Sequence, residues 1–578
     1  MPEPTDRTRV PHATDMNIDT PALDEVAGQY AALEARLTAA PDSDARLAVI
    51  RDWDTLRSML DSWRSLTHLR FNQDTDNQTF RAARKQCDEL TPRLTRLDVS
   101  LKRKLLGSPH RSELEQRFGA QAFALWESDV TAFEPAIEDD LVGEARLEAE
   151  YVELLAGARI RFRGEDLNLP EIRRHATGGD RDTRHEAELA RWTWFTDHAP
   201  ELDRIFTDLV QLRTSMAKKL GLPSYVELGY RRMQRIDYDA DDVARFRTEV
   251  REHVVPLAAT LRQRQAARLG VSRLCFWDEA VHDPKGNPEP QGDHAWMLAR
   301  AQETFDAMHP DLSSFFAMMQ DRGLLDLQAR DGKSDGGFCT GFPIWGVPFI
   351  FGNFNGSKAD VDVFTHESGH AFQFYHSQNM ELLDYVWPTA ESCEVHSMGL
   401  EFLTWPHMER FFGDRAERFR RNHLTDALLF LPYGTAVDHF QHLVYERPEA
   451  SPDERRQMWL EMERTYLPWR RYRDLAHPAA GGVWQLQRHI YINPFYYIDY
   501  CLAQTCALQF WIRSREDASA TLDAYVALCK RGGRLPFQAL VRSAGLSSPF
   551  DEGVLERVVD QSQAALEILA ATCSKDIC

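Results

Sequence analysis

The 578-residue sequence lacks the features of several protein classes. No stretch reaches the roughly 18 consecutive apolar residues that a membrane-spanning helix needs, so we expect no membrane partner. The first residues contain no apolar run, which argues against a signal peptide. The nine cysteines include no CxxC pair, and an odd, dispersed set is typical of reduced thiols. These absences together predict a cytoplasmic protein.

The sequence also lacks an excess of basic residues. It contains 89 acidic and 68 basic side chains, a formal net charge of −21. Nucleic acids and anionic membranes both favour clustered Lys and Arg, so we expect no nucleic-acid partner. Internal repeats and low-complexity tracts are absent as well.

Helical periodicity dominates what is present. It runs from about residue 21 to 157, returns from about 180 to 330, and resumes from 360 to about 571. Residues 159–172 alternate polar and apolar side chains and predict a strand pair. Residues 332–356 are rich in Gly and aromatic residues, which favours turns and a short sheet. The pattern predicts a mostly α fold with one small sheet. It divides into a disordered tail (1–20), an N-terminal helical domain (21–160) and a larger domain (161–570).

The chemistry of the larger domain centres on the segment VFTHESGHAFQFYHSQ, residues 363–378. His366, Glu367 and His370 form an HExxH motif, and four residues advance a helix by about 400°, so both imidazoles lie on one face. Two histidines in this arrangement bind a single zinc ion. Glu367 projects about 100° from His366, where it reaches a metal-bound water without binding the metal itself.

The third metal ligand has more than one candidate. His376 has the spacing of the HExxHxxGxxH pattern, but Gln373 stands where that pattern needs a helix-breaking glycine. If the helix continues, His376 points away from the metal, and we interpret it as a surface residue or an outer contact of the site. The segment 388–405 instead places Glu394 and Glu401 on one helical face, with Glu391 as the main rival. Glu401 or Glu391 could also hold a ligating imidazole from behind.

Three separated blocks resemble one known family. The blocks 337–373, ESCEVHSMGLEFL at 391–403 and RHIYINPFYYIDYCLAQ at 488–504 are similar to the oligoendopeptidase F and thimet oligopeptidase family. The resemblance implies a two-lobed helical body with a deep channel and one Zn²⁺ per chain. In that family the third ligand is the first Glu of E-x-x-S-x-x-x-E, which corresponds here to Glu394, with Ser397 and Glu401 in register.

The third block supplies candidate donors for the developing oxyanion. The resemblance assigns substrate contacts or intermediate stabilisation to a histidine and tyrosines of this region, which we carry to His489, Tyr496 and Tyr500. Tyr497 could take the place of either tyrosine. A hydrolase needs neutral donors at such positions, although an aromatic core stripe would use the same residues.

The segment VPFIFGNFNG at 347–356 has two interpretations. An exposed strand beside a zinc cleft would pair with the backbone of a peptide. A buried strand with flanking turns explains the same residues.

The sequence therefore predicts a zinc-dependent endopeptidase that hydrolyses internal bonds of short peptides. The alternatives are a zinc carboxypeptidase of the related helical class and a non-catalytic peptide-binding protein. Monomer and homodimer both stay open.

Overall fold

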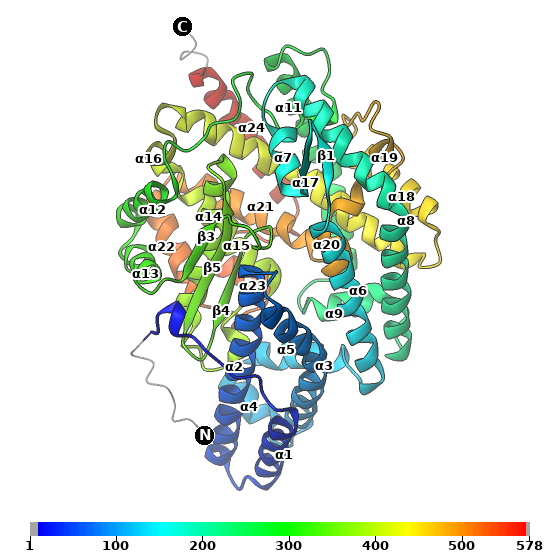
Figure 1. Ribbon diagram of the computed structural model, residues 1–578. Coiled ribbons are helices and arrows are strands. Elements are labelled where there is room, and N and C mark those ends of the chain that lie inside the picture. Colours follow the sequence, from blue (N-terminus) through cyan, green and yellow to red (C-terminus); the bar gives the residue numbers. More distant parts are fainter. Residues whose placement is uncertain (1–9, 574–578) are drawn as a thin grey trace.

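Helices form most of the structure, a computed structural model that describes residues 10–573 (Figure 1). This confirms the mostly α class. Within the described part of the chain, no helix is long and apolar enough to cross a membrane. The helices of the first part of the chain are α1 (Leu23–Ala39), α2 (Ser43–Gln73), α3 (Gln78–Leu106), α4 (Arg111–Phe118), α5 (Ala120–Thr131) and α6 (Glu138–Ala156).

The later helices follow two short strands. They are α7 (Leu169–Thr177), α8 (Arg181–Lys219), α9 (Tyr225–Arg232), α10 (Ala240–Glu249), α11 (Val255–Arg268), α12 (His294–Met308), α13 (Pro310–Asp321), α14 (Lys358–Ser377), α15 (Ala390–Leu403), α16 (Glu409–Phe412), α17 (Ala416–Glu446), α18 (Pro452–Tyr466), α19 (Ala476–Ala479), α20 (Arg488–Ile492), α21 (Tyr497–Ser514), α22 (Ala518–Cys529), α23 (Phe537–Ser543) and α24 (Val554–Cys573).

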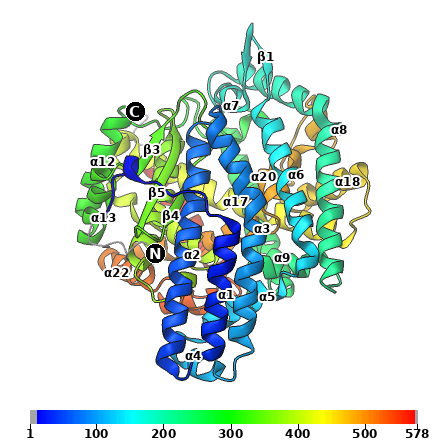
Figure 2. The same ribbon diagram turned by 60° about the horizontal axis from the view of Figure 1, so that its bottom comes forward.

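The N-terminal helices surround a second hydrophobic core, to which Leu382 and Tyr385 from the segment between α14 and α15 also contribute. Helices α1, α2 and α3 run side by side (Figure 2), and Trp53 of α2 meets Trp126 of α5 with ring centroids 5.5 Å apart. The indole of Trp53 also donates a hydrogen bond of 2.8 Å to Asp98 of α3. Leu147 and Tyr151 of α6 belong instead to the main core of the protein. Helix α6 therefore packs with the larger body, although the predicted N-terminal domain extends to residue 160.

The predicted disordered tail differs from the structure over residues 10–20. Residues Ala13–Asp15 form a short 3-10 helix, and Met16 is only 1% exposed. The carbonyl of Met16 accepts a hydrogen bond of 2.6 Å from Arg70 of α2. Ala13 also donates a backbone hydrogen bond of 2.9 Å to the carbonyl of Arg322, and Val10 and Ile18 pack against the main core. These few contacts hold the segment in place, which its polar composition did not reveal. Residues 1–9 of the predicted tail lie outside the described residues.

Two small sheets accompany the helices. Strands β1 (Ile160–Phe162) and β2 (Glu165–Leu167) form the antiparallel pair that the sequence predicts at 159–172. The second sheet has the order β3-β5-β4, from β3 (Leu325–Gln328), β4 (Phe338–Phe342) and β5 (Val347–Phe354). Strand β5 is parallel to β3, antiparallel to β4 and largely buried. The interpretation of 347–356 as an exposed strand is therefore wrong, because both edges of β5 are already paired. Strand β4 lies at the edge of this sheet.

Helix α14 carries the HExxH motif and begins at a well-formed cap. The carboxylate of Asp360 accepts hydrogen bonds from the backbone amides of Asn355, Gly356 and Ser357. A carboxylate at this place accepts hydrogen bonds from amides that have no partner within the helix. Its negative charge also interacts favourably with the positive end of the helix dipole. The helix continues through the buried Gln373 to Ser377, as the residue type predicts.

Helices α14 and α15 touch backbone to backbone at Gly369, the glycine within the motif. A Cβ atom placed there would lie 2.5 Å from the carbonyl oxygen of His396 and 2.6 Å from the Cα of Ser397. Contacts this short do not occur between real atoms, so only glycine lets the two helices approach this closely. The edge strand β4 also reaches α14, because a Cβ at Gly341 would overlap the ring of Phe374.

We expect Gly369→Ala to lower the free energy of unfolding by about 1–3 kcal/mol, because the added methyl group forces the two helices apart. Urea denaturation of the metal-free protein measures this change. Gly399→Ala on α15 is the matched control. Its added Cβ would meet only side-chain atoms of Phe510 and Tyr525, at ordinary distances of 3.5 Å or more. Equal stability of the two variants would contradict the close backbone contact.

Candidate active site

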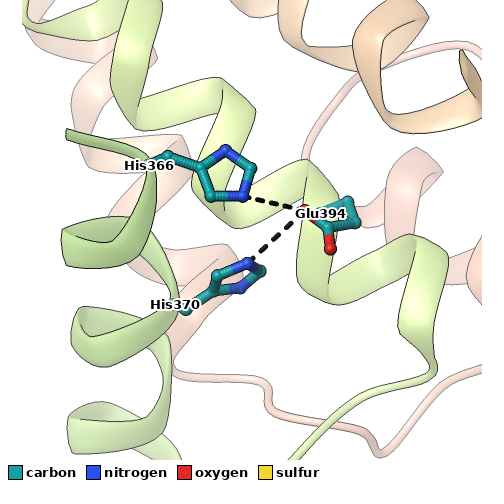
Figure 3. A group of neighbouring side chains, drawn as sticks. All are labelled: His366, His370 and Glu394. Carbon is teal, nitrogen blue, oxygen red and sulfur yellow. Dashed lines mark ion pairs between the residues drawn. The ribbon is translucent and has the colours of Figure 1, made fainter. Parts of the chain in front are cut away.

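His366 and His370 lie one turn apart on α14 and face Glu394 of α15 (Figure 3). The Nε2 atoms of His366 and His370 lie 3.2 Å and 3.4 Å from the same oxygen, Oε2 of Glu394. The three ligand atoms all lie within 4.8 Å of one another. The structure thus brings together the three residues that the sequence and the resemblance name as metal ligands.

This donor group fits zinc. Two imidazole nitrogens and one carboxylate oxygen are a common protein set for catalytic zinc, with bonds of about 2.0–2.2 Å. Tetrahedral coordination with such bonds separates neighbouring ligand atoms by about 3.3–3.5 Å. The two nitrogen–oxygen distances have nearly this length. Glu394 is almost fully buried, while His366 and His370 keep 19% and 13% of their side chains exposed, so the open side of the group faces solvent.

Hydrogen bonds fix the carboxylate of Glu394. Its Oε1 accepts a bond of 2.6 Å from the hydroxyl of Tyr496, and its Oε2 accepts one of 2.9 Å from Ser397. Burial alone would raise the pKa of this carboxyl, but His370 and His366 hold it well below its ordinary value. Glu394 is therefore ionised, as a metal ligand must be. The role of Ser397 on α15 is therefore to hold the Glu394 carboxylate by this hydrogen bond.

Glu401 lies behind His366. The sequence left either Glu401 or Glu391 to hold a ligating imidazole, and the structure places Glu401 there. Its Oε1 is 2.7 Å from Nδ1 of His366, and its Oε2 is 2.8 Å from Nε2 of His423 on α17. Burial opposes ionisation of Glu401, but the bonds from His366 and His423 lower its pKa to about 2. A carboxylate in this place orients the imidazole and directs the other ring nitrogen toward the metal position.

The two rival ligands lie away from the donor group. The side chain of Glu391 bonds to Thr389 at 2.8 Å, and burial followed by the charge of Asp499 raises its pKa to about 8. His376 packs edge-on against Phe372 with ring centroids 4.4 Å apart, and burial lowers its pKa to about 4. The prediction that His376 points away from the metal agrees with this placement. Its interpretation as a surface residue or outer contact does not, because its side chain is only 12% exposed and contacts Phe372, Tyr375 and Asp311 rather than any of the three proposed ligands.

Glu367 lies between the donor group and strand β4. Its carboxylate is 7% exposed and accepts a hydrogen bond from the backbone amide of Cys339. Burial is the largest influence on its pKa and raises it above the ordinary value, against the opposing effects of His366 and His370. A raised pKa brings a carboxylate closer to the range in which it exchanges protons at neutral pH.

His489 and three tyrosines form a cluster next to Glu394, which Tyr496 contacts directly. The ring of His489 lies 5.8 Å from Tyr496, 5.1 Å from Tyr497 and 5.7 Å from Tyr500, measured between centroids. Burial and the neighbouring Arg488 lower the pKa of His489 to about 4, so this imidazole is neutral near pH 7. Tyr500 is also a neutral donor, since burial raises its pKa.

Two residues that the sequence did not point to orient His489. The amide nitrogen of Gln487 lies 2.9 Å from Nδ1 of His489, and the amide oxygen accepts a bond of 2.9 Å from Tyr433. With Nδ1 accepting from Gln487, the proton of His489 resides on Nε2, which lies 3.4 Å from the hydroxyl of Tyr500. Only the two-residue separation of Gln487 from His489 could have suggested this contact.

Two family models match the chain. The model described as "Peptidase M3 N-terminal domain" matches residues 13–133, and the model described as "Peptidase family M3" matches residues 175–560. The second match spans more than half of the chain and includes every candidate site residue. The chain therefore belongs to peptidase family M3, which confirms the resemblance seen in the sequence.

Solved structures give the same result. PZ peptidase A, in a structure with an inhibitor, is 42% identical with a TM-score of 0.94, and the match covers 96% of this chain and 99% of that one. A protein from Bacillus anthracis strain Ames, provisionally assigned as oligoendopeptidase F, is 39% identical with a TM-score of 0.90, covering 96% and 98%. Oligoendopeptidase F from Enterococcus faecium shares the fold at 14% identity, with a TM-score of 0.65 and coverage of 96% and 98%. A comparison with curated proteins gave no match.

We expect Glu394→Gln to lose bound zinc, because an amide oxygen is a weaker ligand than a carboxylate. Glu391→Gln should keep zinc, since Glu391 is already protonated at neutral pH and glutamine has nearly the same shape. Elemental analysis after dialysis against a weak chelator measures the zinc content of both variants. Retention of zinc by Glu394→Gln, or its loss from Glu391→Gln, would assign the third ligand to another residue.

Proposed function

We propose that this peptidase is a zinc-dependent endopeptidase that cleaves internal bonds of short peptides. The observation that carries the proposal is the placement of one oxygen of Glu394 at 3.2 Å and 3.4 Å from the two motif imidazoles. A bound zinc ion supplies a Lewis acid that polarises the scissile carbonyl and lowers the pKa of water. His366, His370 and Glu394 would hold it.

Glu367 has the role of general base in this proposal. Its buried carboxylate lies beside the donor group, with a raised pKa that favours proton exchange. It takes a proton from the attacking water and then delivers a proton to the leaving amine. The backbone amide of Cys339 lies on the β4 side of this carboxylate and favours its ionised form.

His489 and Tyr500 have the role of oxyanion donors. Both are neutral, and the proton on Nε2 of His489 faces Tyr500 across a long contact of 3.4 Å. A contact of this length is weak, so both donors can turn toward a substrate oxygen at little cost. Tyr496 is already committed to Glu394 by its 2.6 Å bond and holds that ligand in place.

Strand β4 is the proposed partner of the peptide backbone. It is one of the two edge strands of the sheet, and the one whose Cys339 lies beside Glu367. A peptide that pairs with an edge strand gains affinity from main-chain hydrogen bonds, whatever its side chains are. This role replaces the one that the sequence suggested for 347–356.

The proposed cytoplasmic location agrees with the cysteines. The seven whose side chains the structure describes, from Cys87 to Cys529, are all free thiols. Reduced cysteines are the rule where glutathione and thioredoxin act.

We expect Glu367→Gln to keep its zinc but to lose about 10²–10⁴-fold in kcat/KM, because the general base is absent while all three ligands stay. The substrate is an internally quenched peptide blocked at both ends, which a carboxypeptidase cannot cut. Cleavage by the wild-type protein therefore excludes a pure carboxypeptidase, and release of the C-terminal residue from the unblocked peptide, without cleavage of the blocked one, would support that alternative. Full activity of Glu367→Gln would refute the proposed base. An inactive but peptide-binding wild-type protein would support the non-catalytic alternative.

Removal of the hydroxyl group is expected to affect catalysis at Tyr500 but not at Tyr497. Tyr500→Phe should lower kcat about 100-fold with little change in KM, because it removes a donor that acts on the developing oxyanion. Tyr497→Phe should be nearly neutral, since its ring packs on Phe430 and its hydroxyl bonds to no described residue. Steady-state kinetics on the same blocked peptide distinguishes the two. A larger loss for Tyr497→Phe would reverse the assignment.

A further inference from the structure

A buried chain of hydrogen bonds leads away from His366 into the protein. Nδ1 of His366 bonds to Oε1 of Glu401 at 2.7 Å, and Oε2 of Glu401 bonds to Nε2 of His423 at 2.8 Å. Nδ1 of His423 then accepts a bond of 3.1 Å from the indole nitrogen of Trp405. The chain joins α14, α15 and α17, and both of its last two members are less than one-tenth exposed.

The donor at the end of this chain sets the direction of every bond in it. An indole N–H can only donate, so Nδ1 of His423 must accept and its proton must reside on Nε2. That Nε2–H donates to Glu401, whose carboxylate accepts at both oxygens and therefore stays ionised. The only partner left for its first oxygen is a proton on Nδ1 of His366. Nε2, the other ring nitrogen of His366, faces Glu394, and a bound metal ion would take its lone pair there.

The surroundings hold the last two members in place. The carbonyl oxygen of Trp405 accepts two hydrogen bonds from the guanidinium of Arg420, at 3.0 Å and 2.7 Å. The ring of His423 lies nearly parallel to Phe419, with an angle of 9° and centroids 5.6 Å apart, and also touches Phe402 at 4.8 Å. Rotation of the imidazole would break both of its hydrogen bonds and these ring contacts.

We propose that His423 is a positioning residue of the metal site and that Trp405 fixes its tautomer, so that Glu401 is held as the acceptor for His366. Neither residue reaches the metal position or the substrate; both act through Glu401. The inference rests on the proposed zinc site and adds two residues to it. Mutation of a residue that orients a metal ligand typically lowers metal affinity or activity by about 10–100-fold.

A double-mutant cycle on zinc affinity tests the proposal. Affinity is measured by competition with a chromophoric chelator, using metal-free full-length protein. His423→Leu should weaken zinc binding about tenfold in the wild-type background and have little further effect in a Glu401→Gln background, because its influence passes through Glu401. Equal losses in both backgrounds, or no loss in the wild-type background, would overturn the proposal. Failure of the wild-type protein to bind zinc would instead overturn the proposed metal site.

A control and a rescue separate positioning from general damage. His442→Leu removes another buried histidine of the same helix, which bonds to Tyr230 at 3.2 Å, and should leave zinc affinity unchanged. His423→Gln retains one donor and one acceptor and should recover most of the lost affinity. Urea denaturation of each metal-free variant shows whether it is folded. If the zinc affinities of the three variants rank in the same order as their urea unfolding midpoints, the loss of affinity reflects general destabilisation, and a positioning role is refuted.

Trp405→Phe addresses the tautomer directly. Phenylalanine keeps the ring contacts with Phe402 and Trp511 but removes the donor to His423. In the wild-type protein, ¹⁵N NMR of labelled histidine should show an unprotonated Nδ1 and a protonated Nε2 for His423, assigned by its absence in His423→Gln. In Trp405→Phe the Nδ1 signal should shift toward the protonated type. A protonated Nδ1 in the wild-type protein would overturn the proposal.

Discussion

The candidate active site depends on the backbone contact between α14 and α15 at Gly369. The two motif histidines lie on one side of this glycine's helix, and the facing ligand Glu394 is three residues before Ser397, whose Cα the glycine touches. Packed helices usually lie 8–10 Å apart, a distance set by the side chains between them. With no side chain at the crossing, the short arm of a glutamate can reach both imidazoles.

Around this contact, hydrogen bonds determine the role of each polar group. Glu394 accepts from Ser397 and Tyr496, Glu401 accepts from two histidines, and His489 accepts from Gln487. Buried polar groups are costly unless each has a partner, so such a network strongly favours one arrangement. The protein thereby holds two carboxylates ionised and one imidazole neutral within a single region, before any metal or substrate adds its own charge.

The sequence predicts the local features of this site and misses those that depend on packing. Helical periodicity and the HExxH spacing suffice for His366, Glu367 and His370, because all three lie within two turns of one helix. Spacing alone could not choose among Glu391, Glu394 and Glu401, which all belong to α15; the choice depends on where α14 crosses it. The resemblance supplied that choice. The sequence left strand β5 open between an exposed and a buried strand, because a run of apolar residues looks the same at the centre of a sheet as at an edge facing a ligand. The structure confirms the buried strand. His423 is 22 positions from Glu401, a separation that carries no signal of contact.

The position of Tyr496 along the chain has a consequence for biosynthesis. This tyrosine, which secures Glu394, follows it by 102 residues, and α21 begins at the next residue. A chain emerging from the ribosome exposes the histidine pair and the glutamate well before the segment that covers them is made. A nascent chain that stops before residue 496 therefore lacks the hydroxyl group that bonds to Glu394.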